Sequence, residues 1–421
     1  MPQIKAPKGT RDILPPETSA WQAVERAFAS VCARFGYAEV RVPTFEHTEL
    51  FQRGVGDTTD IVQKEMYTFP DKGGRSLSLR PEGTAGVMRA YVENGMPSLP
   101  APVKLYYLIS AFRYENVQKG RYREFHQFGC EAVGSAGPAI DAEMIGLLSV
   151  FFGELGLSRL AVRLNSIGCP ACRPAYHEAL RAYLRPRLGE MCGLCNERFD
   201  RNPLRVLDCK EERCQPAIEG APAQLDHLCA DCRAHFDGLK DELDRIGVPY
   251  SVDRRIVRGL DYYTRTVFEF VSENVGTQGT ICGGGRYDGL VEEVGGPPTP
   301  GIGFALGVER LLMEMGAQGI PAAAPATVAL YVAAVDEAAG GAARALCHRV
   351  RAAGVAAEAE WNGRGLKAQM KAANRMGARY VVVLGGDELA AGTARLKDMK
   401  DGSEREVALD RLPQELAAAL K

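Results

Sequence analysis

The pattern of apolar and polar residues is clearest in the last quarter of the chain. Apolar runs that suit buried strands lie at 328–335 and 380–384, and an alternating run lies at 355–361. Helical spacing of apolar residues separates these runs at 338–353 and 364–376. Strands that alternate with helices predict a small α/β domain of roughly 95 residues.

The rest of the chain has a more mixed pattern. Apolar strands are expected at 105–109 and 125–130, and the run 267–271 alternates again. Between them lies a charged segment rich in cysteine, with helical spacing at 173–184 and 233–246. We therefore expect four parts, which are a core, an insertion, a linker rich in Gly, Pro and Ala, and the α/β domain. Their boundaries are 1–165 with 248–318 for the core, 166–247 for the insertion, 319–326 for the linker and 327–421 for the α/β domain.

Composition excludes several classes of protein. Of 421 residues, 46% are hydrophobic and 25% are charged, which is ordinary globular usage and excludes a disordered or fibrous chain. The 51 basic and 53 acidic residues give a net charge of −2, so a nucleic-acid surface must be a local patch. No apolar run reaches the roughly 18 residues of a membrane span, and residues 1–16 lack the apolar region of a signal peptide. We expect a cytoplasmic protein with no membrane partner.

Eight of the twelve cysteines fall within the segment 169–232, in four closely spaced pairs. The pairs are Cys169/Cys172, Cys192/Cys195, Cys209/Cys214 and Cys229/Cys232. Two such pairs complete a tetrahedral Cys₄ site, so eight ligands would serve two structural Zn²⁺ ions. A helix over 174–185 would be about 18 Å long at about 1.5 Å per residue, so the pairs at its two ends should not share an ion. Free thiols and redox disulfides are the alternatives.

Two basic motifs suggest anion binding. The first is an expected hairpin loop at 113–123. Its eleven residues include three arginines (Arg113, Arg121 and Arg123) and Lys119, with Gly120 at a turn. Arginine gives bidentate, permanently charged contacts to phosphate, although a solvated hairpin tip would have the same composition. The second is the run 301–310, an apolar strand that leads into a helix with Arg310 in its first turns. An arginine there can face an anion, or it can simply mark a strand-to-helix junction.

Taken together, these segments resemble the motifs of class II aminoacyl-tRNA synthetases. Residues 36–51, with Pro43, resemble motif 1. Phe112-Arg113-Tyr114-Glu115 with the strand after it resembles motif 2, and 301–310 resembles motif 3. Arg258-Gly-Leu-Asp-Tyr-Tyr-Thr264 and Cys282-Gly-Gly-Gly-Arg-Tyr-Asp-Gly-Leu290 resemble the two histidine-specific motifs of histidyl-tRNA synthetases, and 8–12 and 79–84 also match that family. Because these motifs follow in the expected order over the whole chain, it is identified as a member of that family, of the bacterial type.

The resemblance implies a fold and a reaction. The core would be α+β, an antiparallel sheet flanked by helices, with a helical Cys-rich insertion and a C-terminal α/β anticodon-binding domain. Motif 1 would form the interface of a homodimer. ATP and L-histidine would give histidyl adenylate and pyrophosphate, and the 3′ end of tRNA(His) would then take the histidyl group. The family does not require zinc in this insertion, so the cysteine pairs are a departure from it.

Residue roles carry over position by position. For ATP, which Mg²⁺ would accompany, the resemblance implies that Arg113 contacts the α-phosphate, Phe125 stacks on the adenine and Arg310 lies against the adenine and terminal phosphate. Glu115 belongs to the same ATP site. Arg258 would contact the α-phosphate and the histidine carboxylate, partly replacing a metal ion, which places it with Arg113 and Glu82 among the catalytic residues.

For histidine, Glu82, Thr84 and Gln127 would accept hydrogen bonds from the ammonium group, with Gly83 between the first two. Glu131 and Tyr263 would bind the two ring nitrogens, with Tyr262 beside them. A site that bonds both nitrogens can reject analogues by roughly 10⁴-fold, because the wrong side chain leaves buried polar groups unpaired.

Two surfaces are candidates for tRNA. In the motif 2 loop, Gln118, Arg121 and Arg123 would meet the acceptor end, where the family reads an extra 5′ guanine. In the C-terminal domain, five cations at helical spacing predict one basic stripe with no acid between Trp361 and Tyr380. They are Arg364, Lys367, Lys371, Arg375 and Arg379. An ordinary exposed helix face is the alternative.

Two other functions share parts of this pattern. Synthetase-like paralogues bind histidine and regulate the first enzyme of histidine biosynthesis without acting on tRNA. They lack the anticodon-binding domain and have altered ATP-site arginines, whereas this chain keeps Arg113, Arg258 and Arg310. Class II synthetases for threonine, proline or glycine share the domain order, but the run 258–263 argues against them.

Overall fold

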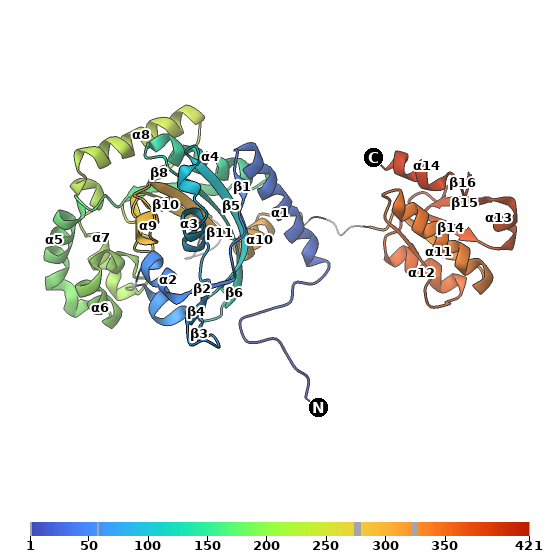
Figure 1. The fold of residues 1–421 in the computed structure, drawn as a ribbon, viewed down its shortest axis with the longest axis horizontal. Coiled ribbons are helices and arrows are strands. Elements are labelled where there is room, and N and C mark those ends of the chain that lie inside the picture. The colour runs from blue at the N-terminus through green and yellow to red at the C-terminus, as the bar shows by residue number, and fades with distance from the viewer. Residues whose placement is uncertain (1, 57–58, 273–278, 322, 324–326, 421) are drawn as a thin grey trace. The chain divides into compact units, whose positions relative to one another are not determined.

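The computed structural model describes residues 2–56, 59–272, 279–321, 323 and 327–420. It divides into two compact units, Met1–Ala323 and Ala324–Lys421, each of which is described by itself (Figure 1). Within the described residues, no helix is long and apolar enough to cross a membrane.

An eight-stranded sheet forms the centre of the first unit (Figure 1). Its order is β1 (Ala38–Glu39), β5 (Val103–Phe112), β6 (Glu124–Val133), β11 (Gly301–Gly307), β10 (Thr280–Arg286), β9 (Thr264–Ser272), β7 (Leu160–Ser166) and β8 (Ser251–Val252). The five inner pairs are antiparallel, as predicted, and the two outermost pairs, β1/β5 and β7/β8, are parallel. The predicted strands 105–109 and 125–130 lie within the β5/β6 hairpin, and 267–271 lies within β9.

One face of this sheet carries the main apolar core. It packs against α1 (Glu17–Arg34), α4 (Pro138–Glu154), α8 (Ala230–Ile246) and α10 (Val308–Ala317). Phe28 of α1 stacks on Phe128 of β6 with ring centroids 4.8 Å apart. Phe268 and Phe270 of β9 enter the same core. Because side chains alternate between the faces of a strand, the polar residues between these aromatics must face the other way.

The opposite face carries the functional polar residues. It packs against α3 (Thr84–Glu93) and α9 (Leu290–Glu293), whose apolar residues form a second core with Tyr107 of β5. The helix α2 (Thr48–Val55) packs against Ala85 of α3 in a separate small cluster. A three-stranded sheet of β2 (Phe45–His47), β4 (Ser76–Leu79) and β3 (Thr68–Pro70) and a short π-helix, η1 (Ile61–Glu65), complete this side. The alternation therefore separates a dry aromatic core from a polar face on the same sheet.

The Cys-rich insertion leaves the sheet after β7 and returns at β8. It contains α5 (Arg173–Leu184), η3 (Arg185–Glu190), α6 (Gly193–Arg201), η4 (Pro203–Asp208), η5 (Glu212–Cys214), α7 (Gln215–Glu219), η6 (Gln224–His227) and α8. The predicted helix 173–184 is confirmed by α5, and 233–246 lies inside α8. Tyr176, Leu180 and Phe199 are part of a separate small core within the insertion.

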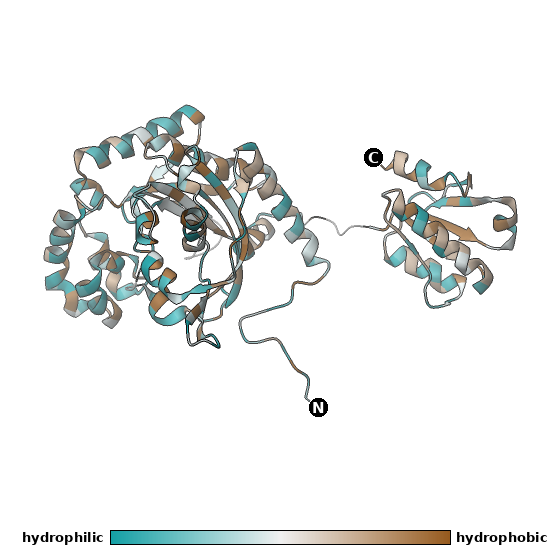
Figure 2. Ribbon diagram, viewed as in Figure 1, coloured by the Kyte–Doolittle hydropathy of each residue, from teal (hydrophilic) through white to brown (hydrophobic). Residues whose placement is uncertain are grey.

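The second unit is a five-stranded sheet with helices on both faces. Its order is β13 (Ala357–Ala359), β12 (Leu330–Ala334), β14 (Tyr380–Leu384), β15 (Thr393–Asp398) and β16 (Glu404–Ala408). Alternate residues of β12 face α11 (Glu337–Ala352) with α14 (Leu412–Ala419) and, on the other side, α12 (Leu366–Arg375). The short helix α13 (Gly386–Ala391) precedes β15. In Figure 2 the inner strands β12 and β14 are mainly brown and the helices of this unit carry both colours, as expected for strands buried on both faces of a sheet.

Candidate functional site

A cavity of about 440 Å³ opens on the polar face of the large sheet. Most of the residues predicted for histidine and ATP line it. They are Glu82, Thr84, Arg113, Glu115, Phe125, Gln127, Arg258, Tyr262, Tyr263 and Arg310, and Arg121 of the motif 2 loop joins them. The structure thus brings together residues that lie up to 228 positions apart in the sequence, from Glu82 to Arg310.

Glu82 is held at the amino end of α3. Its two carboxylate oxygens accept hydrogen bonds from the backbone N–H groups of Thr84 (2.7 Å) and Ala85 (2.8 Å). Burial raises the pKa of Glu82, and these bonds oppose that effect. Gly83 lies behind the cavity wall, where a Cβ atom would stand 2.4 Å from the ring of Tyr107. The glycine therefore allows α3 to begin this close to β5.

Two buried polar atoms beside the cavity have no hydrogen-bond partner among the described residues. They are Oε1 of Gln127 and Nε of Arg258. Buried polar atoms are almost always paired in folded proteins, so an unpaired acceptor and an unpaired donor at one cavity indicate groups that a ligand satisfies.

Arg258 lies flat against β10 and pairs with a carboxylate that the sequence analysis missed. Its guanidinium forms an ion pair with Glu269 of β9, which also accepts a hydrogen bond from the Thr280 hydroxyl (2.9 Å). Burial lowers the pKa of Arg258, but the charge of Glu269 outweighs that effect, so the pKa is raised. A Cβ atom on Gly283 would stand 2.3 Å from the guanidinium, which explains a glycine there. The available signal for Glu269 was one acid within the otherwise apolar run 267–271.

The other guanidinium groups also have fixed positions. Arg113 donates from Nε to the carbonyl of Pro81 (2.9 Å), and its guanidinium lies 5.3 Å from the centroid of the Phe125 ring. Arg310 donates to the carbonyl of Thr280 (2.9 Å), and burial lowers the pKa of Arg310. Glu115 lies 3.5 Å from Arg121, near enough to orient it.

Glu131 lies beneath the cavity wall rather than on it. Its carboxyl group contacts the hydroxyls of Thr84 (2.7 Å), Tyr107 (3.3 Å) and Tyr287. Burial raises the pKa of Glu131 to about 8, and the hydroxyl contacts oppose that shift. Tyr263, its predicted partner, is on the wall, and burial raises the pKa of Tyr263 to about 12, so its hydroxyl remains protonated.

The motif 2 loop closes into a tight turn. Gln118 and Arg121 exchange backbone hydrogen bonds of 3.2 and 2.9 Å around Gly120, whose φ of +77° favours glycine. The guanidinium of Arg123 stacks 3.6 Å from the centroid of the Tyr114 ring. The backbone N–H of Arg123 donates a hydrogen bond to the carbonyl of Gly9 (2.8 Å). Gln118 and Arg123 do not line the cavity; they lie on the loop beside it.

The predicted five-cation stripe is wrong at both ends. Arg364 precedes α12 and pairs with the buried Glu360 (2.8 Å), and Arg379 follows α12 and pairs with Asp398 (3.1 Å). Sequence spacing counted the cations without the acids that the fold brings to them. The cations on α12 itself are Lys367, Lys371 and Arg375.

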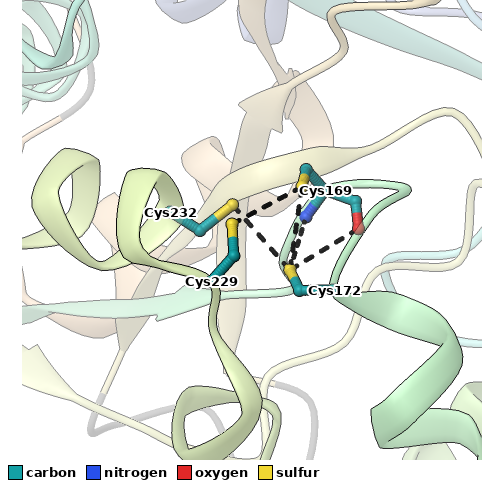
Figure 3. Close-up of side chains that lie close together, drawn as sticks. All are labelled: Cys169, Cys172, Cys229 and Cys232. Carbon is teal, nitrogen blue, oxygen red and sulfur yellow. Dashed lines mark hydrogen bonds between the residues drawn. The ribbon is translucent and has the colours of Figure 1, made fainter.

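The eight cysteines form two clusters, each with its four sulfur atoms within 4.8 Å of one another. Figure 3 shows the first, Cys169 and Cys172 with Cys229 and Cys232, which joins the two ends of the insertion. The second unites Cys192, Cys195, Cys209 and Cys214. The expectation that the pairs at the two ends of α5 do not share a site is confirmed.

The distances between sulfur atoms fit a tetrahedral metal site. Cys169 lies 3.8 Å from Cys172 and from Cys229, and Cys192 lies 3.8 Å from Cys209. Four ligands at the usual Zn–S distance of about 2.3 Å stand about 3.8 Å apart, whereas a disulfide requires about 2.05 Å. All of these thiols are free. The clusters thus have the donor set and spacing of structural zinc sites.

The first unit matches a known family over most of the chain. Residues 9–311 match the family model described as histidyl-tRNA synthetase. The chain belongs to this family. Residues 329–419 match a model described as an anticodon binding domain.

Relatives and solved structures agree with this membership. The chain is 58% identical over 408 residues to a histidine–tRNA ligase of Acetivibrio thermocellus, covering 97% of this chain and 98% of the relative. It is 48% identical to that of Clostridioides difficile, with 99% of both chains covered. The structure of apo histidyl-tRNA synthetase from S. aureus is 38% identical and superposes with a TM-score of 0.84, covering 99% of this chain and 100% of that one. A Bacillus halodurans protein titled ATP phosphoribosyltransferase regulatory subunit/histidyl-tRNA synthetase shares the fold at 21% identity, with a TM-score of 0.65, covering 91% of this chain and 99% of that one.

Proposed function

We propose that this protein joins L-histidine to tRNA(His) in two steps, with histidyl adenylate as the intermediate and AMP and pyrophosphate as products. One observation carries the proposal. Buried hydrogen-bond acceptors (Glu82, Gln127) and guanidinium groups (Arg113, Arg258, Arg310) line one cavity in a member of the histidyl-tRNA synthetase family. The acceptors suit an ammonium group, and the guanidinium groups suit phosphates.

In the first step, a carboxylate oxygen of histidine attacks the α-phosphorus of ATP, and the bond to the bridging oxygen breaks to release pyrophosphate. Mg²⁺ enters with ATP as part of the substrate. Arg113 and Arg258 neutralise the charge that develops on the α-phosphate, while Phe125 and Arg310 hold the adenine and the terminal phosphate. Because their partners fix these side chains before substrate binds, little reorganisation is needed in the transition state.

Recognition of histidine uses both charge and hydrogen bonding. Glu82 and the unpaired oxygen of Gln127 accept from the ammonium group, with Thr84 beside them. Tyr263, next to Tyr262, binds one ring nitrogen on the cavity wall. Glu131 binds the other from beneath that wall, where the hydroxyls of Thr84, Tyr107 and Tyr287 hold its carboxyl group. With a pKa of about 8, Glu131 holds a proton at neutral pH and can therefore donate to an imidazole nitrogen as well as accept.

In the second step, the terminal ribose hydroxyl of tRNA attacks the histidyl carbonyl and AMP leaves. The motif 2 loop, with Gln118, Arg121 and Arg123, contacts the acceptor end. The second unit, with Lys367 and Lys371 and with Arg364 beside α12, contacts the anticodon region. Residues 36–51 form the interface of a homodimer.

The two cysteine clusters each hold one structural Zn²⁺. A closed Cys₄ site supplies folding energy and leaves no position for a substrate, so the ions make no direct contact with the reacting groups. Elemental analysis of dialysed protein should give about two zincs per chain. Protein that folds normally with no zinc would contradict this assignment.

ATP–pyrophosphate exchange with each of the twenty amino acids, in the absence of tRNA, tests the function directly. Exchange with histidine alone is the expected result, with an Arg113→Ala variant as the inactive control. Histidine binding without any exchange would favour a regulatory protein instead, and exchange with another amino acid would overturn the proposed substrate.

A further inference from the structure

One short segment of the insertion belongs both to a cysteine cluster and to the wall of the main cavity. Cys209 is a member of the second cluster, and its two sequence neighbours, Asp208 and Lys210, line the cavity beside the histidine and ATP residues. Among the cavity-lining residues that the structure describes, Lys210 is the cation that the insertion supplies; the arginines come from the core.

The insertion is tied to the core next to this segment. Arg198 and Arg205 each donate to the carboxylate of Asp60 (2.9 Å), and Asn202 donates to Asp261 (3.0 Å), which lies within the first histidine motif. These contacts fix α6 and the start of η4. The end of η4 and the residues after it depend instead on the cysteine cluster that follows.

The cysteine cluster determines where residues 208–210 lie. Cys209 follows directly after η4. Its sulfur atom lies 3.8 Å from that of Cys192, and its carbonyl accepts a hydrogen bond from the Gln215 side chain (2.7 Å). Thiolates gathered this closely repel one another unless a cation neutralises them. Metal binding therefore stabilises the conformation that places Lys210 on the cavity wall.

Lys210 itself is available to a ligand. Its side chain is 80% exposed and its ammonium group lies 3.0 Å from Asp208, an exposed pair of a kind that contributes little stability. A phosphate group in the cavity would be a stronger partner for the ammonium than this carboxylate, because phosphate carries more charge and more acceptor oxygens.

We propose that a zinc ion on Cys192, Cys195, Cys209 and Cys214 holds Lys210 at the cavity, where its ammonium group binds a phosphate of a substrate. The cluster is thus a positioning element for catalysis as well as a support for the insertion. The identity of the phosphate rests on the proposed function, because ATP and the 3′-terminal nucleotide of tRNA are the two sources of phosphate that the reaction provides.

Kinetics of Lys210 variants test the ligand. Lys210→Ala should raise one KM about tenfold, the usual effect of losing a charge-assisted hydrogen bond, and leave the KM for histidine unchanged. A raised KM for ATP in exchange without tRNA assigns the phosphate to ATP, and a raised KM for tRNA alone assigns it to the acceptor end. Lys210→Arg keeps the positive charge and should bring that KM most of the way back to the wild-type value. Lys240→Ala, on α8 of the same insertion, is the matched control. If Lys210→Ala changes neither KM, the proposal is wrong.

Metal content and hydrogen exchange test whether the cysteine cluster holds residues 208–210 in place, without any assay of activity. Cys192→Ser should lower zinc from two to one per chain and speed hydrogen exchange in a peptide covering 203–216, while Cys229→Ser should also remove one zinc but leave that peptide protected. Two zincs in Cys192→Ser, or unchanged exchange in that peptide, would overturn the coupling.

A double variant tests whether the zinc cluster acts on substrate binding through Lys210. If zinc acts through Lys210, adding Lys210→Ala to Cys192→Ser should raise the affected KM no further, because the lysine has already left its position. Fully additive effects would contradict the proposal. The metal and exchange results stand even if the protein activates no amino acid, so failure of the proposed function would be recognised separately.

Discussion

Several charged side chains around the cavity are held in place by other groups of the protein. Backbone N–H groups of α3 hold Glu82, Glu269 holds Arg258, and the carbonyl of Thr280 holds Arg310. Each of these contacts fixes a side chain before a substrate arrives. At the scale of single residues, the site is therefore preorganised, and changes to its charged groups should affect individual chemical steps.

Replacing Arg258 should separate the two steps. Arg258→Ala should reduce the rate of adenylate formation by about 10²- to 10³-fold, because one preorganised donor to the α-phosphate is lost. Transfer from preformed adenylate should fall far less. Single-turnover measurements of each step check this, with Arg258→Lys as a variant that keeps the charge but loses the bidentate fork. Equal losses in both steps would contradict the assigned role.

Glu131 should make stability depend on pH. Its pKa is raised from an ordinary 4.5 to about 8 by burial, so the folded protein keeps a proton that the unfolded chain releases near pH 4.5. Between these values the folded state binds more protons, and the free energy of unfolding from this group falls as pH rises. Glu131→Gln cannot titrate and should flatten that decline.

Urea unfolding midpoints at pH 5, 6, 7 and 8 measure the effect. The midpoint of the wild-type protein should decline more steeply over this range than that of Glu131→Gln. The pH dependence of Glu309→Gln provides a comparison, since Glu309 is another buried carboxylate at the cavity. Parallel curves for wild type and Glu131→Gln would show that Glu131 ionises normally.

At the scale of secondary-structure elements, a buried ion network joins helices to the glycine-rich strand of the site. Arg286 of β10 is fully buried and pairs with Asp141 of α4, which also contacts His235 of α8 (2.8 Å). Arg286 further pairs with Asp288 (3.0 Å), just beyond the strand. Since Gly283 to Gly285 precede Arg286 directly, this network fixes the strand that backs Arg258.

Removing the charge of Asp141 should therefore be costly. Asp141→Asn would leave the guanidinium of Arg286 buried without its main partner and should lower the free energy of unfolding by about 3 kcal/mol or more. Asp288→Asn should cost clearly less, because Asp288 is 30% exposed and Asp141 remains in place. Urea unfolding of both variants makes the comparison, and equal losses would show that Asp141 is not the main partner.

Secondary-structure elements could be predicted from the sequence where the local pattern of residues determines them. The length of the helix at 173–184 was enough to separate the cysteine pairs at its ends, and the structure agrees. The β15/β16 hairpin was missed, although Asp401-Gly402, with φ of +77° at the glycine, is a typical turn signal. The basic stripe was overextended because Glu360 and Asp398 approach its ends only in the folded chain.

At the scale of the whole molecule, function follows from contacts between distant segments. The family motifs indicated which residues gather at the cavity, but they contain no trace of Glu269 or Lys210, whose roles depend on a neighbouring strand and on the insertion. The chain nevertheless divides into two compact units with separate cores. This division predicts that activation of histidine and binding of the anticodon region can be altered independently.

The cations of α12 provide that test. Replacing Lys367, Lys371 and Arg375 together by alanine should weaken tRNA binding and make the slope of log affinity against log salt shallower by about 2 to 3, since each lost phosphate contact contributes about 0.7–0.9. ATP–pyrophosphate exchange without tRNA should be unchanged, because the cavity lies wholly in the other unit. The same triple replacement at Arg395, Lys397 and Arg405, on the β15/β16 hairpin of the same unit, controls for the loss of charge. If both triple variants change the slope equally, α12 offers no specific contact, and the attraction of tRNA to this unit is a general effect of its charge.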